Sequence, residues 1–492
     1  MFSITSSKMR SIDANCSYLG QIPVQLMENA GASIAREIIS KISSGKVLFV
    51  AGRGNNGGDA FVAARHLAMN KNYDVKLIIL GHSSRIRTEE SKQNFSLLQY
   101  SGLTEIKEIT DSKELEKYPG WMNNDIIVDG VLGSGIKGVP REPESTAIDL
   151  INSSNSYIIS IDSPSGYDLD GGKFVKSVIA DLTITFHKMK TGLELPNSEK
   201  YAGQVKVAPI GVCRDAEEYV GMGDLMSLAC RNKDSHKGNS GRVLVVGGGA
   251  YYGAPALAAM AALRTGADIV TVAVPENVAD TVASFSPDLI VVPLEGERLN
   301  PSNIPVIKNL LQTHDVAVIG PGLGREKETQ ETVEQLLPLC RKAVVDADAL
   351  FGLKLPIKSE VKFILTPHSA EFSRLSGSDV PKELDSKKNL VNQFASGKDV
   401  TVILKGKTDI ISDGTVTRLN RTGNAGMTVG GTGDVLTGIT GALFAVNDAM
   451  DAASCAVFIN GSAGDLAFEE RGNGLLATDI IDRITDVILG VL

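Results

Sequence analysis

The segment KVLFVAGRGNNGGDAFVAARHLA, from Lys46 to Ala68, decides the fold of the first half of this 492-residue chain. It starts with an apolar run, continues through a glycine-rich loop and ends in residues with the apolar spacing of a helix. That order predicts a buried strand, a tight loop and a helix. Because strands that alternate with helices form parallel sheets covered on both faces, the segment indicates an α/β domain.

Apolar runs of the same kind recur along the chain, separated by segments of helix or loop length. In the first half they are VKLIIL (75–80), DIIVDGVLG (125–133), YIISIDSPSG (157–166) and LTITF (182–186). In the second half they are RVLVVGGG (242–249), DIVTVAV (268–274), DVAVIGPGLG (315–324), AVVDADAL (343–350), FILTPHSAE (363–371) and VTVILKGKTDII (400–411). A polar stretch separates the two series. We therefore predict two doubly wound, mostly parallel α/β domains, residues 1–212 and 235–492, joined by a linker at 213–234.

The overall charge excludes one broad class of function. A net charge of -9 and a pI near 5.4 argue against a nucleic-acid-binding protein, because neutralising phosphates needs a basic face. Hydrophobic residues make up 43% and charged residues 22%, which is typical of a soluble globular protein. A small anionic ligand remains open, because local backbone amides can outweigh the global charge.

The cysteines and the N-terminus indicate the compartment. Cys16, Cys213, Cys230, Cys340 and Cys455 show no CxxC spacing, so we expect neither disulfides nor a zinc site but buried free thiols in a reducing cytoplasm. The first residues lack the apolar core of a signal peptide, and no apolar run is long enough to span a bilayer. We therefore expect a cytoplasmic protein that is not inserted in a membrane.

The first glycine loop, GRGNNGGD at residues 52–59, formally matches the dinucleotide fingerprint G-x-G-x-x-G. The acidic residue that completes that motif is missing, because the next predicted strand ends at Gly81. Hydride transfer in an ordinary Rossmann unit is therefore disfavoured. The loop offers Asn55, Asn56 and Asp59 beside glycines that allow close approach of a phosphate, although a tight strand-to-helix turn would use the same residues.

Two further predicted strands end in polar residues, Asp129 on one and Asp162 with Ser165 on the other. Ligands of open parallel sheets bind beyond the carboxyl ends of the strands, so these residues and the first loop are expected to share one pocket. Oxygen ligands of this kind suit a hard cation rather than a transition metal. Each carboxylate could equally cap a loop.

Five motifs of the first half, taken in order, resemble the YjeF N-terminal family of NAD(P)HX epimerases. They are LMENAG (26–31), AGRGNNGGDAFVAARHL (51–67), VDGVLGSGIKG (128–138), DSPSGYDLDGG (162–172) and HKMKTGL (187–193). The resemblance spans nearly all of residues 1–212. It implies a Rossmann-like domain that acts on NADHX and NADPHX, the hydrated forms of NADH and NADPH, and that binds K⁺ through positions Asn56, Asp129 and Ser165.

The same resemblance implies which residues contact the epimerase substrate. They are Asn55, Asn56, Gly57, Gly58, Asp59, Gly133, Ser134, Gly135, Ile136, Lys137, Gly138, Val139 and Asp162. The substrate carries a hydroxyl at C6 next to the ring nitrogen, so reversible cleavage at C6 inverts that carbon. Such a step needs a positioned acid/base and no redox cofactor. We assign this role to Asp162, with Lys190 as a candidate for adjusting the local charge.

The second half contains a loop with five glycines around one carboxylate, NAGMTVGGTGDVLTG from Asn424 to Gly438. Amides at the start of the helix that follows would hold nucleotide phosphates. A carboxylate there hinders binding but helps chemistry, because Asp434 can accept the proton of a hydroxyl that attacks phosphorus. The alternative is that Asp434 merely caps the helix. The G-T-G-D arrangement after a lysine-bearing strand resembles the ribokinase-like superfamily.

Longer motifs of the second half resemble the YjeF C-terminal family of ADP-dependent NAD(P)HX dehydratases over residues 235–492. They are the segments 236–268, GPGLG (320–324), VVDADAL (344–350), TPHSAEFSRL (366–375) and NAGMTVGGTGDVLTGI (424–439). The resemblance implies substrate contacts at Ala254, Gly322, His368 and Asp434. It implies nucleotide contacts at Lys405, Gly406, Lys407, Thr408, Asp409, Asn424, Ala425, Gly426, Gly430, Gly431, Thr432 and Gly433. Asp346 could orient the substrate or serve the structure alone.

The two resemblances together imply a bifunctional enzyme that repairs hydrated nicotinamide nucleotides and assembles as a homo-oligomer. The first domain would interconvert the epimers, and the second would phosphorylate C6–OH and eliminate phosphate, with ADP or ATP as donor and Mg²⁺ on the nucleotide. One alternative is a small-molecule kinase, which would share Asp434. Another is that the first half is a nucleotide-sensing or partner-binding module without activity.

Overall fold

The structure is a computed structural model that describes residues 3–133, 135, 138–172, 174–229, 236, 238–357 and 361–490. The chain divides into two compact units, Met1–Ala216 and Glu217–Leu492, and each is described by itself. The segment predicted as a linker contains the short helix α8 (Arg214–Glu218) and the 3₁₀ helix η4 (Met222–Ser227). Within the second unit, a buried ion pair between Arg418 and Asp224 (2.9 Å) fixes η4 against the sheet.

The first unit contains a seven-stranded, fully parallel sheet in the order β3-β2-β1-β4-β5-β6-β7. Its strands are β1 (Gly45–Ala51), β2 (Tyr73–Leu80), β3 (Glu105–Ile109), β4 (Ile126–Gly130), β5 (Tyr157–Ile161), β6 (Leu182–Phe186) and β7 (Gln204–Ala208). The central strands are apolar along their length because helices cover both faces. The strand order is that of a Rossmann fold, as the sequence predicted.

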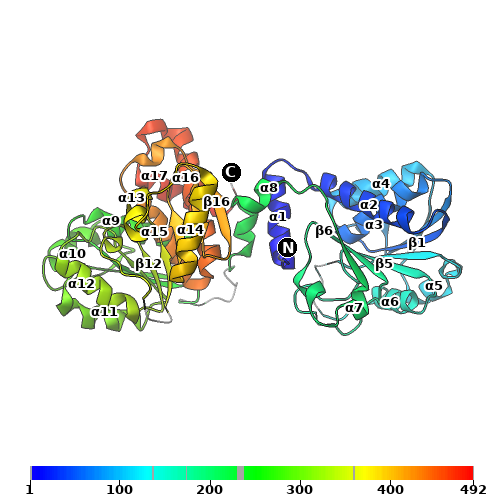
Figure 1. Cartoon of the computed structure of the whole chain (residues 1–492), viewed down its shortest axis with the longest axis horizontal. Coiled ribbons are helices and arrows are strands. Elements are labelled where there is room, and N and C mark those ends of the chain that lie inside the picture. Colours follow the sequence, from blue (N-terminus) through cyan, green and yellow to red (C-terminus); the bar gives the residue numbers. More distant parts are fainter. Residues whose placement is uncertain are drawn as a thin grey trace. The chain divides into compact units, whose positions relative to one another are not determined.

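The helices of the first unit are α1 (Ser6–Tyr18), α2 (Pro23–Lys41), α3 (Asn55–Ala68), α4 (Glu89–Ser101), α5 (Ser112–Lys117), α6 (Glu144–Asn152) and α7 (Glu199–Ala202). Figure 1 shows α2, α3 and α4 on one face of the sheet and α5 and α6 on the other. Each face has its own apolar core. Helix α2 starts at Pro23 because proline lacks an N–H and fits the first helical position.

The second unit contains a nine-stranded sheet in the order β10-β9-β8-β11-β12-β13-β14-β15-β16. Its strands are β8 (Arg242–Val246), β9 (Ile269–Pro275), β10 (Ile290–Leu294), β11 (Val316–Ile319), β12 (Lys342–Val345), β13 (Lys362–Leu365), β14 (Thr401–Leu404), β15 (Asp409–Ser412) and β16 (Thr417–Asn420). All pairs are parallel except β14–β15 and β15–β16. The prediction of two mostly parallel α/β domains is confirmed.

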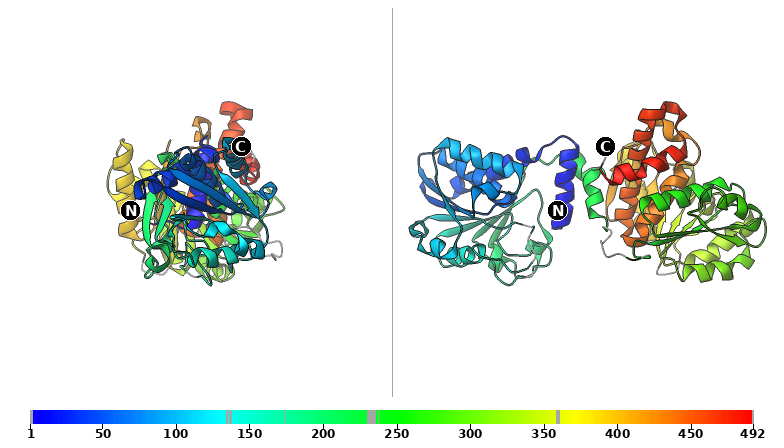
Figure 2. Two further views of the ribbon diagram at one scale, coloured as in Figure 1. Left: turned by 90° about the vertical axis from the view of Figure 1, so that its right-hand side faces the viewer. Right: turned by 180° about the vertical axis from the view of Figure 1, so that it is seen from behind.

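The helices of the second unit are α9 (Gly253–Thr265), α10 (Glu276–Ala283), α11 (Ile304–Leu311), α12 (Lys327–Leu336), α13 (Ser369–Ser376), α14 (Leu384–Lys398), α15 (Thr432–Val446), α16 (Ala449–Arg471) and α17 (Ala477–Ile488). The apolar core on one face contains α9, α15, α16 and α17, and the core on the other contains α11, α12 and α14. Figure 2 shows the C-terminal helices, in orange and red, grouped together.

Four strands lie outside the apolar runs quoted above: β3, β7, β10 and β16. β3 (EIKEI) and β10 (IVVPL) each form one edge of their sheet and are partly exposed, and β3 is more polar than the central strands. β16 is the other edge of the second sheet. The run 400–411 contains two strands, β14 and β15, joined by a turn at residues 405–408.

Both sheets reverse their strand order at a central pair, β1/β4 in the first unit and β8/β11 in the second. Ligands of open α/β sheets bind outside the carboxyl ends of the strands at this point. In the first unit the loops after β1 and β4 contain the predicted epimerase residues. In the second, the loops after β8 and β11 contain Ala254 and Gly322.

The described cysteines are free thiols: Cys16, Cys340 and Cys455 are buried and Cys213 is partly exposed, whereas Cys230 lies outside the described residues. No helix in the described part of the chain has both the length and the apolar character needed to cross a bilayer.

Candidate active sites

The loop after β1 is packed so closely that only glycine fits at two positions. A Cβ on Gly52 would lie 2.0 Å from the carbonyl oxygen of Val131, and a Cβ on Gly57 would lie 2.0 Å from the carbonyl oxygen of Gly52. The loop therefore lies directly against the segment that follows β4. These glycines explain the match to the dinucleotide fingerprint by backbone packing at the strand-to-helix turn.

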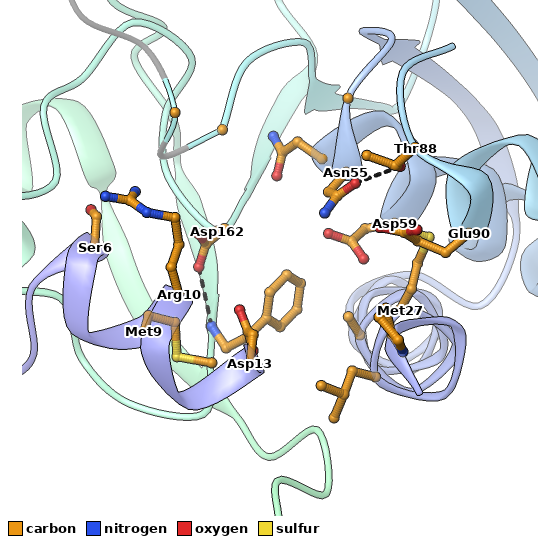
Figure 3. Close-up of a pocket in the computed structure, with 18 of the residues that line it drawn as sticks. Ser6, Met9, Arg10, Asp13, Met27, Asn55, Asp59, Thr88, Glu90 and Asp162 are labelled. Atoms are coloured by element: carbon orange, nitrogen blue, oxygen red, sulfur yellow. Dashed lines mark hydrogen bonds between the residues drawn. The ribbon is translucent and has the colours of Figure 1, made fainter. Parts of the chain in front are cut away.

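A cavity of about 580 Å³ opens beside this loop (Figure 3). The predicted epimerase residues that line it are Asn55, Asn56, Asp59, Gly133, Gly135 and Asp162. Four others, Gly57, Gly58, Gly138 and Val139, are described but do not line it. Ser134, Ile136 and Lys137 lie outside the described residues. The structure thus brings the two loops and the carboxylate of Asp162 together around one cavity.

Asp162 follows β5 and has a left-handed backbone conformation, with φ of 60°. Its Oδ1 accepts hydrogen bonds from the Lys190 ammonium (2.7 Å) and the Thr185 hydroxyl (3.0 Å). The Lys190 side chain is only 2% exposed, and its ammonium also donates to Thr185 Oγ1 and to the Phe186 carbonyl (2.8 Å). Three acceptors therefore hold a buried cation in place next to Asp162. Such strain and such a pair are typical of functional sites.

The three predicted cation ligands are neighbours. Asp129 is fully buried, and its carboxylate accepts from the Ser165 hydroxyl (2.5 Å), the Ser165 N–H (2.8 Å) and the Ser160 hydroxyl (2.8 Å). Burial raises the pKa of Asp129, and the hydrogen bonds from Ser165 and Ser160 act against it. Asn56 donates through Nδ2 to the carbonyl of Leu132 (3.1 Å), whose N–H donates to Ser165 Oγ. This donor set of carboxylate, amide and hydroxyl oxygens fits a hard cation such as K⁺.

Helix α1 contributes residues to the cavity that sequence analysis missed. Arg10 and Asp13 line it, and Figure 3 shows Asp13 beside the bond between Lys190 and Asp162. No motif marked this helix. The one available signal was its mixed composition, because an amphipathic helix with ionisable residues on the face toward the sheet is unusual.

In the second unit, a buried network lies at the carboxyl ends of β12 and β14. Asp346, 2% exposed, follows β12 and accepts from the Lys405 ammonium (2.9 Å) and from the Thr437 hydroxyl of α15 (2.5 Å). Burial disfavours the charged form of Asp346, but Lys405 and the hydrogen bonds outweigh it and lower the pKa of the carboxyl. The pair keeps both charges, although Asp346 is buried and Lys405 is only partly exposed.

Asp434 lies in the first turn of α15, close to this network. The residue that caps α15 is Gly431, with φ of 96°, and no side chain caps the helix. The interpretation of Asp434 as a helix cap is therefore wrong. Burial, and next the Asp346 carboxylate, raise the pKa of Asp434 to about 7, while Lys405 acts in the opposite direction. A carboxyl with that pKa can exchange a proton near neutral pH.

The loop before α15 is fixed by a carboxylate that sequence analysis also missed. Asp465 on α16 accepts from the N–H of Gly423 (2.9 Å) and from Nδ2 of Asn424 (2.8 Å). Asn424 in turn accepts from the N–H of Gly426 and so starts the 3₁₀ helix η8 (Ala425–Thr428). Met427 packs against α16 at Gly464. The shape of this predicted nucleotide loop therefore depends on α16.

Replacing Asp465 with Asn should weaken nucleotide binding without affecting the hydrate. The amide would place an NH₂ group against one of the two donors, so one hydrogen bond is lost and the loop loosens. That loss corresponds to about tenfold in the KM for nucleotide. The check is steady-state kinetics with each substrate varied in turn. Glu469→Gln, a neighbour on the same helix, serves as the control, and an equal rise in both KM values would contradict this role of Asp465.

Other predicted residues organise the same edge of the sheet. His368 caps α13: its Nδ1 accepts from the N–H of Ala370 (3.1 Å), and Glu371 accepts from the His368 N–H (2.8 Å). Asp409 closes the turn after β14 by accepting from the Gly406 N–H (2.9 Å), and burial raises its pKa to about 6. These side chains have structural roles, and contact with a ligand remains a prediction for both.

The remaining predicted residues lie on the loops around this edge. Ala254 is in the first turn of α9. Gly322 lies next to the segment that precedes this helix, because the N–H of Tyr251 donates to the Gly322 carbonyl (3.2 Å). Lys407 and Thr408 lie in the turn between β14 and β15. Gly430 precedes Gly431, the residue that caps α15, and Thr432 is the first residue of that helix. Gly433 lies next to Lys405, because a Cβ on Gly433 would be 3.6 Å from the Lys405 Nζ.

No group of three or more His, Cys, Asp or Glu side chains in the described part of the chain is arranged to hold a metal ion.

Two family models match the chain, one in each half. A family model described as YjeF-related protein N-terminus matches residues 23–192, and one described as NAD(P)H-hydrate dehydratase matches residues 243–486. The chain is 43% identical over 486 residues to the bifunctional NAD(P)H-hydrate repair enzyme Nnr of Archaeoglobus fulgidus, covering 99% of this chain and 98% of that protein.

Solved structures resemble the second half. A hypothetical protein from Streptococcus mutans is 26% identical with a TM-score of 0.50, covering 55% of this chain and 98% of its own. A ribokinase-like superfamily protein from Enterococcus faecalis V583 is 25% identical with a TM-score of 0.49, covering 55% of this chain and 95% of its own.

Proposed function

This chain belongs to the family of bifunctional NAD(P)H-hydrate repair enzymes, and we propose that its two units divide the repair of NADHX and NADPHX between them. The first unit interconverts the R and S epimers at C6. The second converts the S epimer to NADH or NADPH at the expense of ADP, which yields AMP and phosphate. One observation carries the proposal: each unit places a carboxylate beside a lysine at the carboxyl edge of its sheet.

In the first unit, the substrate ring would enter the cavity against Asp162. Oδ1 of this carboxylate is held by Lys190 and Thr185, so Oδ2 is the atom that can face the substrate. Protonation of the C6 hydroxyl lets the C–O bond break as the N1 lone pair forms an N1=C6 bond. Water then adds to the opposite face and gives up a proton, which produces the other epimer. Asp162 exchanges protons in this sequence.

The loops hold the rest of the molecule. Asn55 and the N–H groups at the start of α3 face the cavity, where they can bind phosphate oxygens. Asn56, Asp129 and Ser165 would hold K⁺, whose charge there offsets the buried carboxylate and favours binding of an anionic substrate.

In the second unit, Asp434 accepts the proton of the C6 hydroxyl as that oxygen attacks the terminal phosphorus of the nucleotide. The bond from phosphorus to the bridging oxygen breaks and AMP leaves. The C6–phosphate bond then breaks with loss of a proton from C5, which restores the C5=C6 double bond. Phosphate leaves far more readily than hydroxide, which is the reason for phosphorylation. Lys405, neutralised on one side by Asp346, can bind a phosphate oxygen.

The nucleotide would lie on the loop from Asn424 to Gly433 and on the turn after β14. The amides at the start of α15 can hold its terminal phosphate. We propose ADP as the preferred donor, with Mg²⁺ bound to its phosphates to neutralise their charge. We assign contacts with the hydrate to His368, Ala254 and Gly322.

The test is the recovery of reduced-nicotinamide absorbance from a mixture of both epimers, with purified protein, Mg²⁺ and either ADP or ATP. Complete recovery, faster than spontaneous epimerisation allows, is the expected result, and the faster nucleotide identifies the donor. Recovery that stops when the S epimer is exhausted would mean an inactive first unit. No recovery, together with ATP-dependent phosphorylation of a stable alcohol, would establish a small-molecule kinase instead.

A further inference from the structure

Helix α1 precedes the residues matched by the YjeF-related family model, yet it is fixed directly to the cavity of the first unit. The N–H of Ile4 donates to the Met189 carbonyl (2.9 Å), and the N–H of Thr191 donates to the Ile4 carbonyl (3.1 Å). These bonds form a short parallel bridge at Lys190. The N–H of Ser6 also donates to Asp170 (2.7 Å). The start of α1 is therefore held next to the buried lysine of the site.

The far end of α1 is fixed as well. Ile12 and Cys16 are buried in the apolar core of the unit, and Nδ2 of Asn15 donates to the Ala216 carbonyl (3.1 Å). The helix consequently cannot turn about its axis without breaking these contacts. Its orientation decides which side chains reach the cavity.

One face of α1 lines the cavity. The lining residues of this helix are Ser6, Met9, Arg10, Asp13, Ala14 and Ser17. Their spacing of three and four residues places them on a single stripe of an α-helix. Asp13 and Arg10 are the ionisable members of that stripe, and Figure 3 shows both on the side of α1 that faces Asp162.

Five carboxyls line the cavity: Asp13 from α1, Asp59 from α3 and Asp162 after β5, together with Glu90 of α4 and Glu144 of α6. Figure 3 shows Asp59 across the cavity from Asp162, and Asp13 beside the lysine that holds Asp162. The Lys190 ammonium is already bonded to Asp162, Thr185 and Phe186. The side-chain carboxyl of Asp13 makes no hydrogen bond or ion pair with any described residue. Its carboxyl is therefore available to a ligand.

Inversion at C6 needs two proton transfers, one to the departing hydroxyl on one face of the ring and one from the entering water on the other. A single carboxyl can perform both only if the ring turns over in the site. Because Oδ1 of Asp162 accepts three hydrogen bonds, that residue offers one free oxygen. A second proton-exchanging group would remove the need for the ring to move.

We propose that Asp13 of α1 is this second proton-transfer residue of the epimerase, so that the helix outside the matched family model completes the active site. The inference rests on the proposed epimerase function of the first unit. In the forward direction one carboxylic acid protonates the C6 hydroxyl and water leaves. The entering water then bonds to C6 and passes its proton to the other, ionised carboxyl. The reverse direction exchanges the two roles.

The electrostatics of the cavity support this role. Burial raises the pKa of Asp13 to about 6, with Lys190 lowering it and Asp162 raising it. Burial, and then Asp162 and Asp13, raise the pKa of Asp59 well above its usual range. With a pKa of about 6, Asp13 can take either form near neutral pH, as a reversible proton carrier must. Arg10 of the same helix and Glu90 of α4 also line the cavity.

The experiment follows the conversion of pure S-NADHX to the R epimer by chromatography, without nucleotide, using the full-length protein. The variants are Asp13→Asn, Asp13→Glu and Asp13→Ala, with Ser7→Asn as the control at an exposed position of the same helix. We expect Asp13→Asn to lower the turnover number at least about 100-fold. Asp13→Glu should recover part of that loss, formate should restore activity to Asp13→Ala, and Ser7→Asn should match the wild type.

Two further readouts separate chemistry from folding. The wild-type turnover should fall below about pH 6 as Asp13 becomes protonated, and this limb should vanish in Asp13→Asn. Dehydration by the second unit of the same protein should stay unchanged, which shows that the chain is intact. The proposal is overturned if Asp13→Asn epimerises at the wild-type rate, or if only KM rises and neither glutamate nor formate restores turnover. A wild-type protein without epimerisation would instead refute the proposed function itself.

Discussion

Replacing Asp434 with Asn should reduce dehydration about 1000-fold, because the variant lacks the carboxyl that we assign to accept the proton of the attacking hydroxyl while the start of α15 binds the phosphate. The amide has the same shape and no charge at the pH where Asp434 acts. Nucleotide binding should therefore be kept or slightly strengthened, since a negative charge next to the phosphates disappears. The measurement is the turnover number for S-NADHX with saturating ADP, together with the affinity for ADP by calorimetry.

The matched control for this variant lies in the other unit of the same chain. Asp162→Asn should abolish epimerisation and leave the dehydration of pure S-NADHX unchanged, whereas Asp434→Asn should leave epimerisation unchanged. Loss of both activities in either variant would contradict the assignment of epimerisation to the first unit and dehydration to the second. In wild type the pKa of Asp434, about 7, should appear as a loss of dehydration below neutral pH, because protonation removes the base.

Replacing Asp346 with Asn should have the second large effect, on stability as well as on rate. The substitution leaves the Lys405 ammonium without its carboxylate partner in a site where Asp346 is 2% exposed. Breaking one side of a buried pair costs about 3 kcal/mol, which for a unit of this size corresponds to a melting temperature lower by about 8 °C. Calorimetry of the full-length protein measures it as a shift of one unfolding transition.

The same variant should move the pH dependence of the remaining activity. Asp346 raises the pKa of Asp434 as a like charge and also neutralises Lys405. Without it, the unpaired ammonium favours the carboxylate form of Asp434. The pH below which the dehydration rate falls should therefore be lower in this variant. Thr437→Val offers a graded comparison, because it removes only the hydroxyl partner and should cost about 1 kcal/mol. An unchanged pH dependence in Asp346→Asn would mean that Asp346 does not influence Asp434.

Much of the fold could be predicted because its signals are local. Apolar runs followed by glycine loops specify strands that end in turns, and the alternation with helices specifies parallel sheets. The predictions were incomplete at the edges of the sheets, where β3 (EIKEI) has a composition that resembles that of loops and β10 (IVVPL) contains a proline. The run VTVILKGKTDII contains a hairpin whose turn is the polar segment 405–408.

The candidate sites, like the fold, could be predicted from the sequence only in part. Motifs located Asp162, Asp434 and the loops around them, because glycine spacing and strand ends are readable along the chain. They could not show that Asp434 is no helix cap, since capping depends on which backbone groups lie within hydrogen-bond distance. They also gave no reason to choose between a structural and a functional Asp346. Its contacts with Lys405 and Thr437 join residues 59 and 91 positions away.

The sequence by itself determined the two α/β units, the glycine loops at their strand ends and the carboxylates that follow them, because periodicity and turn chemistry act over a few residues. Only the tertiary structure decided which charges share a site. Asp13 meets Lys190 and Asp162, and Asp465 meets Asn424, through packing between segments far apart in the chain. Proton affinity depends on burial and on nearby charges, so the acid/base character of these carboxyls exists only in the folded protein.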